Sequence, residues 1–338
     1  MKKNLLPAKG RFYKANLHCH TTFSDGECTP EEIKKIYKEH GYSIVAYTDH
    51  DILIAHDELN DEGFLALHGF ETETTEKKPF AEAKTCHLCY IALRRDQLIQ
   101  PNWHRSAYLI GNAPEYRDWV RFDPSKPDFV REYTPENVNR MIANARSEGF
   151  FITYNHPTWS LEDYRDYAAY EGMHAMEIVN YGACAGGFPD YNPRVYDDLL
   201  RAGRRIFCIA ADDNHNGRPA DDPQSDACGG FTVIRARSLD YEAVTDALVK
   251  GHFYASTGPL IRALWIEDDR VHIRCSPAAR IDYTTAIRHC GSVVADKGKT
   301  VREAAFAVRK NDVYFRITVT DRQGRHANTN AFFVDSLL

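Results

Sequence analysis

Apolar and polar residues recur in one repeated order along most of the chain: a helix, a glycine, an apolar strand and a polar cluster. In the first unit, Thr29 is placed to cap a helix that ends at Gly41, and the strand 43–47 follows. The second and third units end in the strands 150–154 and 205–210. Strands rich in Ile, Val and Phe that alternate with helices predict an α/β fold, with a parallel sheet covered by helices.

A polar cluster follows each of these strands, at 48–51, 155–157 and 211–215. The carboxyl ends of parallel strands meet at one edge, and α/β barrels and open sheets place their active sites there. The pattern therefore predicts that several His and Asp side chains lie together on one rim.

Beyond about residue 260 the pattern changes to strict alternation, as in 271–275 and 313–319. A period of two predicts antiparallel strands with one buried face. We therefore divide the chain into an α/β domain at 1–259 and a small antiparallel β-rich, sandwich-like domain at 260–338.

An insertion at about 94–133 fits neither pattern, because Trp, Tyr and Phe stand there among Arg, Asp and Pro. Long connections of this kind are more often functional than idle, so the segment could be a lid over the site. The other interpretation is an extra cap with a small core of its own. Both stay open from the sequence alone.

Composition narrows the class of protein. The 338 residues suggest about two domains, and 43% hydrophobic with 27% charged residues is typical of a soluble globular protein. No apolar run reaches the roughly 20 residues of a membrane-spanning helix. The net charge of −6 argues against an extensive nucleic-acid surface, so we expect a small-molecule partner and no membrane. Nine cysteines without a secretion signal predict reduced thiols and a cytoplasmic location.

The chain has fifteen histidines, and their positions indicate a function. His18 and His20 are two apart in a predicted strand, so both imidazoles can reach one ion. Taken alone, each such residue is better explained as an ordinary hydrogen-bonded side chain. The further candidates on or just after predicted strands and turns are Asp25, His50, Glu71, His87, His156, Asp213 and His215. So many imidazoles and carboxylates on one rim indicate that they hold cations.

The order of these motifs resembles a known family. Ala-Asn-Leu-His-Cys-His-Thr-Thr-Phe-Ser-Asp-Gly at 15–26, followed by Tyr-Thr-Asp-His at 47–50, looks like the polymerase and histidinol phosphatase (PHP) superfamily of metal-dependent phosphoesterases. The match covers about residues 11–220 and continues through Gly-Phe-Glu at 69–71, His87, Asn-His-Pro at 155–157 and Asp-Asn-His at 213–215. The tail at 251–259, before the β-rich domain, is similar to the carbaryl-hydrolase-like branch of that superfamily.

The resemblance implies a distorted (β/α)7 barrel with two or three divalent ions, which would be Zn, Mn or Fe. The implied ligands fall into three groups: His18, His20, Glu71 and Asp213 for one ion; Glu71 as a bridge with His87 and His156 for a second; and Asp25, His50 and His215 for a third. Asp25 stands where some relatives have His, which favours a harder metal or weaker occupancy there. Glu71, Asp213 and His156 would form the catalytic core. Glu73 and Asp212 compete with Glu71 and Asp213, but the motif spacings decide against them.

The implied reaction is hydrolysis of a phosphomonoester or phosphodiester by metal-activated hydroxide, in a small phosphorylated metabolite or a nucleotide or oligonucleotide end. One alternative is a carbamate, ester or amide hydrolase on the same metal site. A second is a non-catalytic protein that binds a carbohydrate or a partner on a metal-stabilised scaffold.

Several further side chains are candidates to support the site. Arg218 could clamp phosphate, because guanidinium matches phosphate oxygens, and Lys84 is a weaker candidate. Trp103 and Trp119 of the insertion could contact the organic part of a substrate. Asp49 could orient His50, and His68 could orient Glu71, although capping or packing explains both residues equally well.

Overall fold

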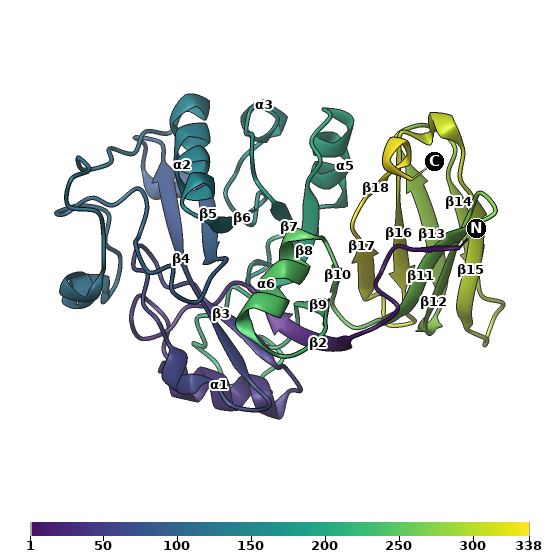
Figure 1. The fold of residues 1–338 in the computed structure, drawn as a ribbon, viewed down its shortest axis with the longest axis horizontal. Helices are drawn as coiled ribbons and strands as arrows, with labels where there is room; N and C mark the ends of the chain where they lie inside the picture. The colour runs from purple at the N-terminus through teal and green to yellow at the C-terminus, as the bar shows by residue number, and fades with distance from the viewer. Residues whose placement is uncertain (1, 338) are drawn as a thin grey trace.

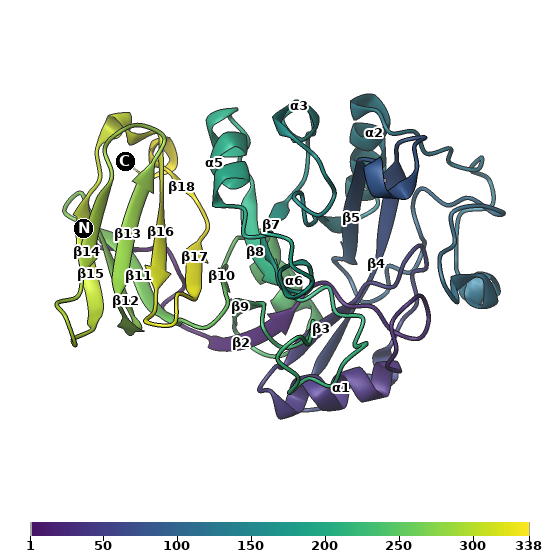
Figure 2. The same ribbon diagram turned by 180° about the vertical axis from the view of Figure 1, so that it is seen from behind.

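A computed structural model describes residues 2–337, and it shows an α/β barrel followed by a β-rich unit (Figures 1 and 2). The barrel wall is built from β2 (Arg11–Asn16), β3 (Ile44–Tyr47), β4 (Leu65–Thr75), β5 (Thr85–Ala92), β6 (Phe150–Tyr154), β7 (Ala175–Asn180), β8 (Phe207–Ala211) and β9 (Phe231–Ala236). In space their order is β9-β2-β3-β4-β5-β6-β7-β8. The helix-and-strand alternation of the sequence is thus confirmed as an α/β fold.

The prediction of a parallel sheet is correct for two runs of strands and wrong for two strands. β2, β3 and β4 are parallel, and so are β6, β7 and β8. β5 is antiparallel to both of its neighbours, and β9 is antiparallel to β2. The connection 76–84 between β4 and β5 explains the first exception, because a parallel crossover needs a dozen or more residues.

The barrel is closed just beyond the ends of β2 and β8. Cys19 and Asn214 form an isolated parallel bridge, the backbone N–H of His20 donates to the Asn214 carbonyl, and that of Asp213 donates to the His18 carbonyl. The closure therefore brings the polar segment after β2 against the polar segment after β8, which lie about two hundred residues apart in the chain.

The helices are α1 (Pro30–Glu39), α2 (Pro135–Ser147), α3 (Tyr164–Tyr167), α4 (Tyr181–Ala185), α5 (Pro193–Arg201) and α6 (Tyr241–Val249), with short 3-10 turns η1 (Asp57–Leu59), η2 (Phe80–Glu82), η3 (Ala113–Trp119), η4 (Lys310–Asp312) and η5 (Val334–Ser336). Thr29 caps α1 and forms the expected capping box with Glu32. Val244 and Leu248 of α6 are fully buried in the same cluster as Ile44 and Leu67 of the barrel strands. Full burial of each such side chain stabilises the fold by about 1.5–3 kcal/mol. Within residues 2–337, no helix is long and apolar enough to cross a membrane.

The β-rich unit contains the alternating strands that the sequence predicts. Its strands are β11 (Ile261–Glu267), β12 (Arg270–Ala278), β13 (Arg280–Thr285), β14 (Gly291–Val294), β15 (Val301–Ala307), β16 (Tyr314–Thr320), β17 (His326–Thr329) and β18 (Phe332–Phe333). β10 (Phe253–Ser256) pairs with both β9 and β17, so one sheet continues from the barrel into this unit. The division at residue 259 stays a prediction. β1 (Lys3–Asn4) pairs with β11, so these two residues add a strand to the β-rich unit.

The insertion 94–133 forms a cap at the opposite end of the molecule from the β-rich unit (Figure 1). Trp103, Ala113 and Val120 are buried in a small cluster with Ile52. The backbone N–H of Asn112 donates to the Ser24 carbonyl at 2.7 Å. At the neighbouring Gly111 the backbone has φ +58°, and a Cβ there would collide with that same carbonyl. This packing favours the interpretation as a structural cap with its own core.

Candidate metal centre

The predicted rim residues converge at one end of the barrel. His18 and His20 follow β2, His50 follows β3, Glu71 lies in β4 and His87 in β5. His156 follows β6, and Asp213 and His215 follow β8. β2, β3, β6 and β8 end at this rim, whereas Glu71 lies inside β4 and His87 lies near the start of β5.

Asp213 and Glu71 lie on either side of the first histidine. Nε2 of His18 is 3.1 Å from Oδ1 of Asp213 and 3.2 Å from Oε1 of Glu71. Nε2 of His20 is 3.0 Å from the same Asp213 oxygen. Nε2 of His20 also lies 3.5 Å from Oε2 of Glu71, so each of the two histidines contacts both carboxylates of the first implied ligand group.

Glu71 also contacts the second group. Its Oε1 lies 3.3 Å from Nδ1 of His87 and 3.4 Å from Nε2 of His156. Nε2 of His156 is in turn 3.7 Å from Oδ2 of Asp213. The Glu71 carboxylate thus stands between two sets of imidazoles, which is the position a bridging ligand requires.

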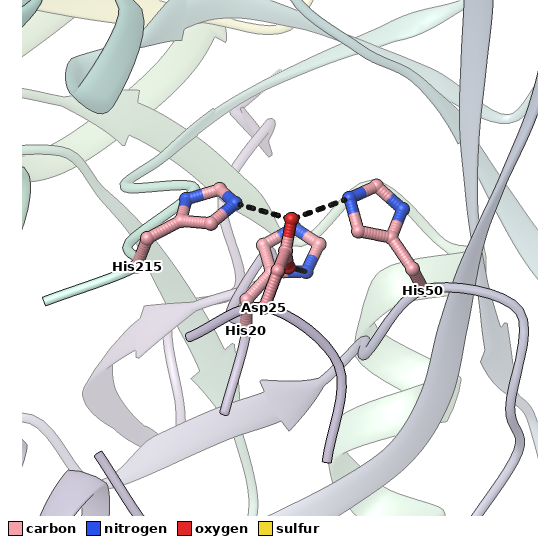
Figure 3. Close-up of side chains that lie close together, drawn as sticks. All are labelled: His20, Asp25, His50 and His215. Carbon is pink, nitrogen blue, oxygen red and sulfur yellow. Dashed lines mark ion pairs between the residues drawn. The ribbon is translucent and has the colours of Figure 1, made fainter. Parts of the chain in front are cut away.

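The third group surrounds Asp25, as Figure 3 shows. Oδ2 of Asp25 is 3.6 Å from Nε2 of His50 and 3.5 Å from Nε2 of His215. His20 belongs to this group as well, since its Nδ1 lies 3.6 Å from Oδ1 of Asp25 and its ring stands 4.4 Å from the rings of His50 and His215. His20 therefore connects the first and third groups, whereas the resemblance implied it as a ligand of the first ion only.

The donor set suits a transition-metal ion. Nδ1 of His20 and of His50 and both ring nitrogens of His87 are buried and make no well-directed hydrogen bond among the described residues, although carboxylate oxygens lie 3.1–3.6 Å away. Leaving a buried polar group unsatisfied costs about 1–3 kcal/mol. A cation coordinated by these nitrogens and by the nearby carboxylates would remove that cost. Imidazole with carboxylate is a common ligand set for Zn, Mn and Fe, so the residues present fit such ions.

Electrostatics keep the carboxylates of the cluster charged. Burial by itself raises the pKa of Glu71 and of Asp213, but His18 and the other imidazoles outweigh it and hold both pKa values well below their usual range. Burial likewise lowers the pKa of His87, yet Glu71 and Glu73 raise it to about 10. His50 behaves in the opposite way, because burial and His20 lower its pKa to about 3. Ionised carboxylates are therefore present as potential ligands throughout the neutral range.

Glu177 in β7 holds two of the histidines, and the sequence reasoning missed it. Its Oε1 accepts from Nδ1 of His18 at 2.8 Å, and its Oε2 accepts from the backbone N–H of His156 at 2.8 Å and from Nδ2 of Asn180 at 2.9 Å. Glu177 is fully buried. A charged residue inside the otherwise apolar strand Ala-Met-Glu-Ile-Val was the available signal, because a buried charge must be paired.

Two amides hold the carboxylates in a similar way. Nδ2 of Asn155 donates to Oε1 of Glu71 at 2.7 Å, and Nδ2 of Asn180 donates to Oδ2 of Asp213 at 3.1 Å. Ser160 contacts a histidine instead, with its Oγ 3.1 Å from Nδ1 of His156. Each amide occupies one direction of a carboxylate and fixes how its remaining lone pairs point.

The suggested roles of Asp49 and His68 are wrong. Asp49 accepts hydrogen bonds from the backbone of Thr21 and from Oγ of Ser24, both at 2.7 Å, so it shapes the loop that carries Asp25. His68 lies 3.3 Å from Asp57, away from Glu71. Asp212, a competitor of Asp213, accepts the backbone N–H groups of 228–230 and holds a loop.

The suggested substrate contacts are corrected as well. Lys84 is paired with Asp163 at 2.9 Å and with Asp166 at 2.6 Å. Trp103 is buried in the cap, whereas Trp119 is 59% exposed and packs edge-on against Phe23. None of the three lines the cavity over the metal centre. Trp103 is part of the core of the cap, where its large ring buries a large apolar surface.

Arg218 lies outside the cavity but close to it. It lines a neighbouring hollow that shares Gly182, Gly186 and Asp226 with the cavity over the metal centre. Its guanidinium is 54% exposed and 3.7 Å from Asp222. A phosphate clamp at Arg218 stays a prediction.

Barrel, rim and donor set together define a protein with a cluster of candidate metal ligands at the mouth of an α/β barrel. The model of the PHP domain family matches residues 16–214, and the chain belongs to this family. Its fold is accordingly the distorted barrel of the PHP type, followed by a β-rich C-terminal domain. A comparison with curated proteins gave no significant match.

Solved structures with a similar course of the chain share little sequence with it. A two-domain protein from Bacteroides vulgatus that contains a predicted PHP-like metal-dependent phosphoesterase is 14% identical, with 98% of each chain covered and a TM-score of 0.45. A proposed metal-dependent phosphoesterase from Bifidobacterium adolescentis is 18% identical over 65% of this chain and 93% of that one, with a TM-score of 0.38. An amidohydrolase from Chromobacterium violaceum, with bound sulfate and no metal, is 16% identical over 60% and 87%, with a TM-score of 0.36.

Proposed function

We propose that this protein is a metal-dependent phosphoesterase that hydrolyses a small phosphorylated metabolite or a nucleotide end. The observation that carries the proposal is the position of Glu71, whose carboxylate lies within 3.2–3.4 Å of ring nitrogens from His18, His87 and His156. A buried carboxylate shared by several imidazoles is what a site for two neighbouring cations requires. Membership of the PHP family supports the same activity.

The chain's own residues divide the work of such a site. Glu71 would bridge two ions, and Asp213, with His18 and His20, would hold the first. His87 and His156 would hold the second, while Asp25, His50 and His215 offer a third position. Bound divalent ions supply a water of lowered pKa and positive charge to stabilise the phosphoryl transition state.

The remaining residues keep this arrangement rigid. Glu177 fixes the ring of His18, and Asn155 and Asn180 fix the carboxylates of Glu71 and Asp213. Fixed dipoles of this kind favour catalysis because they need no reorganisation during the reaction. A separate side-chain base is not required by this arrangement.

A substrate panel tests the proposal. Purified protein supplied with Mn²⁺ or Zn²⁺ is assayed on aryl phosphates, on an aryl phosphodiester and on aryl carbamates and acetates. We expect metal-dependent turnover of a phosphate ester. Turnover of carbamates or carboxylic esters without any phosphate ester would contradict phosphoesterase activity, and would point to a carbonyl hydrolase on the same metal site.

A further inference from the structure

The cavity over the metal centre has an apolar wall that no role in metal binding explains. The cavity has a volume of about 370 Å³, and Phe80, Ile110, Trp159 and Phe188 line it above the ligand cluster. Phe80 and Phe188 are 75% and 39% exposed. Exposed apolar side chains gathered around the mouth of a polar site are typical of a surface that contacts a ligand.

Trp159 brings this wall directly against the proposed metal ligands. Its ring stands edge-on to His156 at 4.9 Å and to His87 at 5.4 Å between centroids. Phe80 extends the wall outward, 6.3 Å from Trp159. If bound ions held the phosphate of an ester, the adjoining organic part would therefore lie beside the indole ring of Trp159.

Apart from histidine, the ionisable residues that line the cavity are all Asp or Glu. No lysine or arginine among the described residues lines it. Glu73 and Asp226 add carboxylates to its wall beyond those assigned to the ions. Arg131 lies behind Glu73, where it donates to the Glu73 carbonyl and pairs with the buried Asp51 at 2.6 Å, so its charge is already engaged.

These observations limit what the cavity accepts. Bound ions would neutralise a single phosphate, but a second anionic group inside the cavity would find no lysine or arginine in the described lining and would face carboxylates. Arg218 lies in the neighbouring hollow, 3.7 Å from Asp222. A volume of about 370 Å³ is near the lower end of the roughly 300–1,000 Å³ of small-molecule sites. We propose that the preferred substrate is a phosphomonoester whose organic part is compact, uncharged and largely apolar, such as one aromatic ring. This inference rests on the proposed phosphoesterase function and narrows its substrate class.

Three alkyl phosphates with comparable leaving groups test the inference on the metal-loaded protein: 2-phenylethyl phosphate, 2-(4-carboxyphenyl)ethyl phosphate and glycerol phosphate. Burying one phenyl ring against the wall is worth about a factor of ten or more. We expect kcat/KM for 2-phenylethyl phosphate to exceed that for each of the other two at least tenfold, with most of the difference in KM.

Variants locate the preference on the wall. Trp159→Ala should lower kcat/KM for 2-phenylethyl phosphate about tenfold more than that for glycerol phosphate. Phe188→Ala should also lower kcat/KM more for 2-phenylethyl phosphate than for glycerol phosphate. Because the ring of Phe188 is exposed, its removal should leave the fold intact. Tyr164→Ala is the matched control, because this exposed ring on α3 does not line the cavity.

The outcomes separate the two proposals. Equal or better turnover of the carboxylated or the glycerol ester overturns the inference about substrate class and leaves phosphoesterase activity standing. Equal losses on both test substrates in Trp159→Ala and Phe188→Ala also overturn it. Failure of all three esters and of the wider phosphate panel overturns the phosphoesterase proposal, and the substrate class with it.

Discussion

Replacing Glu177 by Gln should weaken metal binding without disturbing the fold. In the native protein the carboxylate only accepts, so Nδ1 of His18 must carry the proton in their 2.8 Å hydrogen bond. Nε2 of His18, the nitrogen 3.1–3.2 Å from Asp213 and Glu71, is then free to coordinate a cation. The negative charge of Glu177 therefore sets which imidazole nitrogen faces the metal centre.

A glutamine has the same shape but one donor end. If its oxygen keeps the hydrogen bonds from the His156 backbone and from Asn180, its NH₂ group must face Nδ1 of His18. His18 would then accept at Nδ1 and carry its proton on Nε2, which faces the metal centre. Mutation of such supporting groups costs 10–100-fold in metal affinity, or about 1.4–2.7 kcal/mol.

The assay is isothermal titration of the metal-free variant with Mn²⁺ or Zn²⁺, together with thermal unfolding. We expect metal affinity to fall 10–100-fold for Glu177→Gln while the metal-free melting temperature changes little. Glu171→Gln is the control, because this exposed carboxylate pairs only with Arg204 at the surface among the described residues. Unchanged affinity in Glu177→Gln would refute the argument that this carboxylate sets the state of His18.

Three other changes test separate parts of the account. Glu71→Gln should lower phosphoesterase activity by at least about a hundredfold with an unchanged melting temperature, and near-normal turnover would refute the bridging role. Arg131→Met should lower the free energy of unfolding in urea by about 3–5 kcal/mol, because it leaves buried Asp51 without its partner, and a loss below about 1 kcal/mol would contradict this. Burial raises the pKa of Glu162 to about 7 from 4.5, although three tyrosine hydroxyls oppose the shift. The folded state therefore retains a proton that the unfolded state releases, and stability should fall by about 3 kcal/mol as pH rises from about 4.5 to about 7. The difference in unfolding free energy between wild type and Glu162→Gln should show this slope, and a flat difference would contradict it.

The convergence of histidines and carboxylates on one rim could be predicted from the sequence because local pattern and spacing determine it. His18 and His20 had to share one face of the chain after β2, and a polar cluster after each apolar strand had to reach the same edge. The antiparallel course of β5 was missed because an apolar strand reads the same in either direction. The short connection 76–84 was the signal that could have revealed it.

Residues that depend on distant packing were harder to predict. Trp103 and Trp119 looked alike in the sequence, yet one is buried in the cap and the other is exposed, since burial depends on Ile52 and Phe23 from elsewhere in the chain. Trp159 stands beside the ligand motif Asn-His-Pro, but only the fold shows that its ring meets His87 and His156. Lys84 could not be recognised as paired, because Asp163 and Asp166 approach it from α3 and its cap.

The central claim is tested most directly on protein from which metal has been removed with a chelator. Phosphate release is measured as equivalents of Mn²⁺ are added back. Aryl phosphate is the substrate, and bound metal is counted by elemental analysis in the same samples. The account predicts no turnover without metal and a rise that saturates when two to three ions are bound per chain. Full turnover by the metal-free protein, or no metal bound at saturating Mn²⁺ or Zn²⁺, would contradict it.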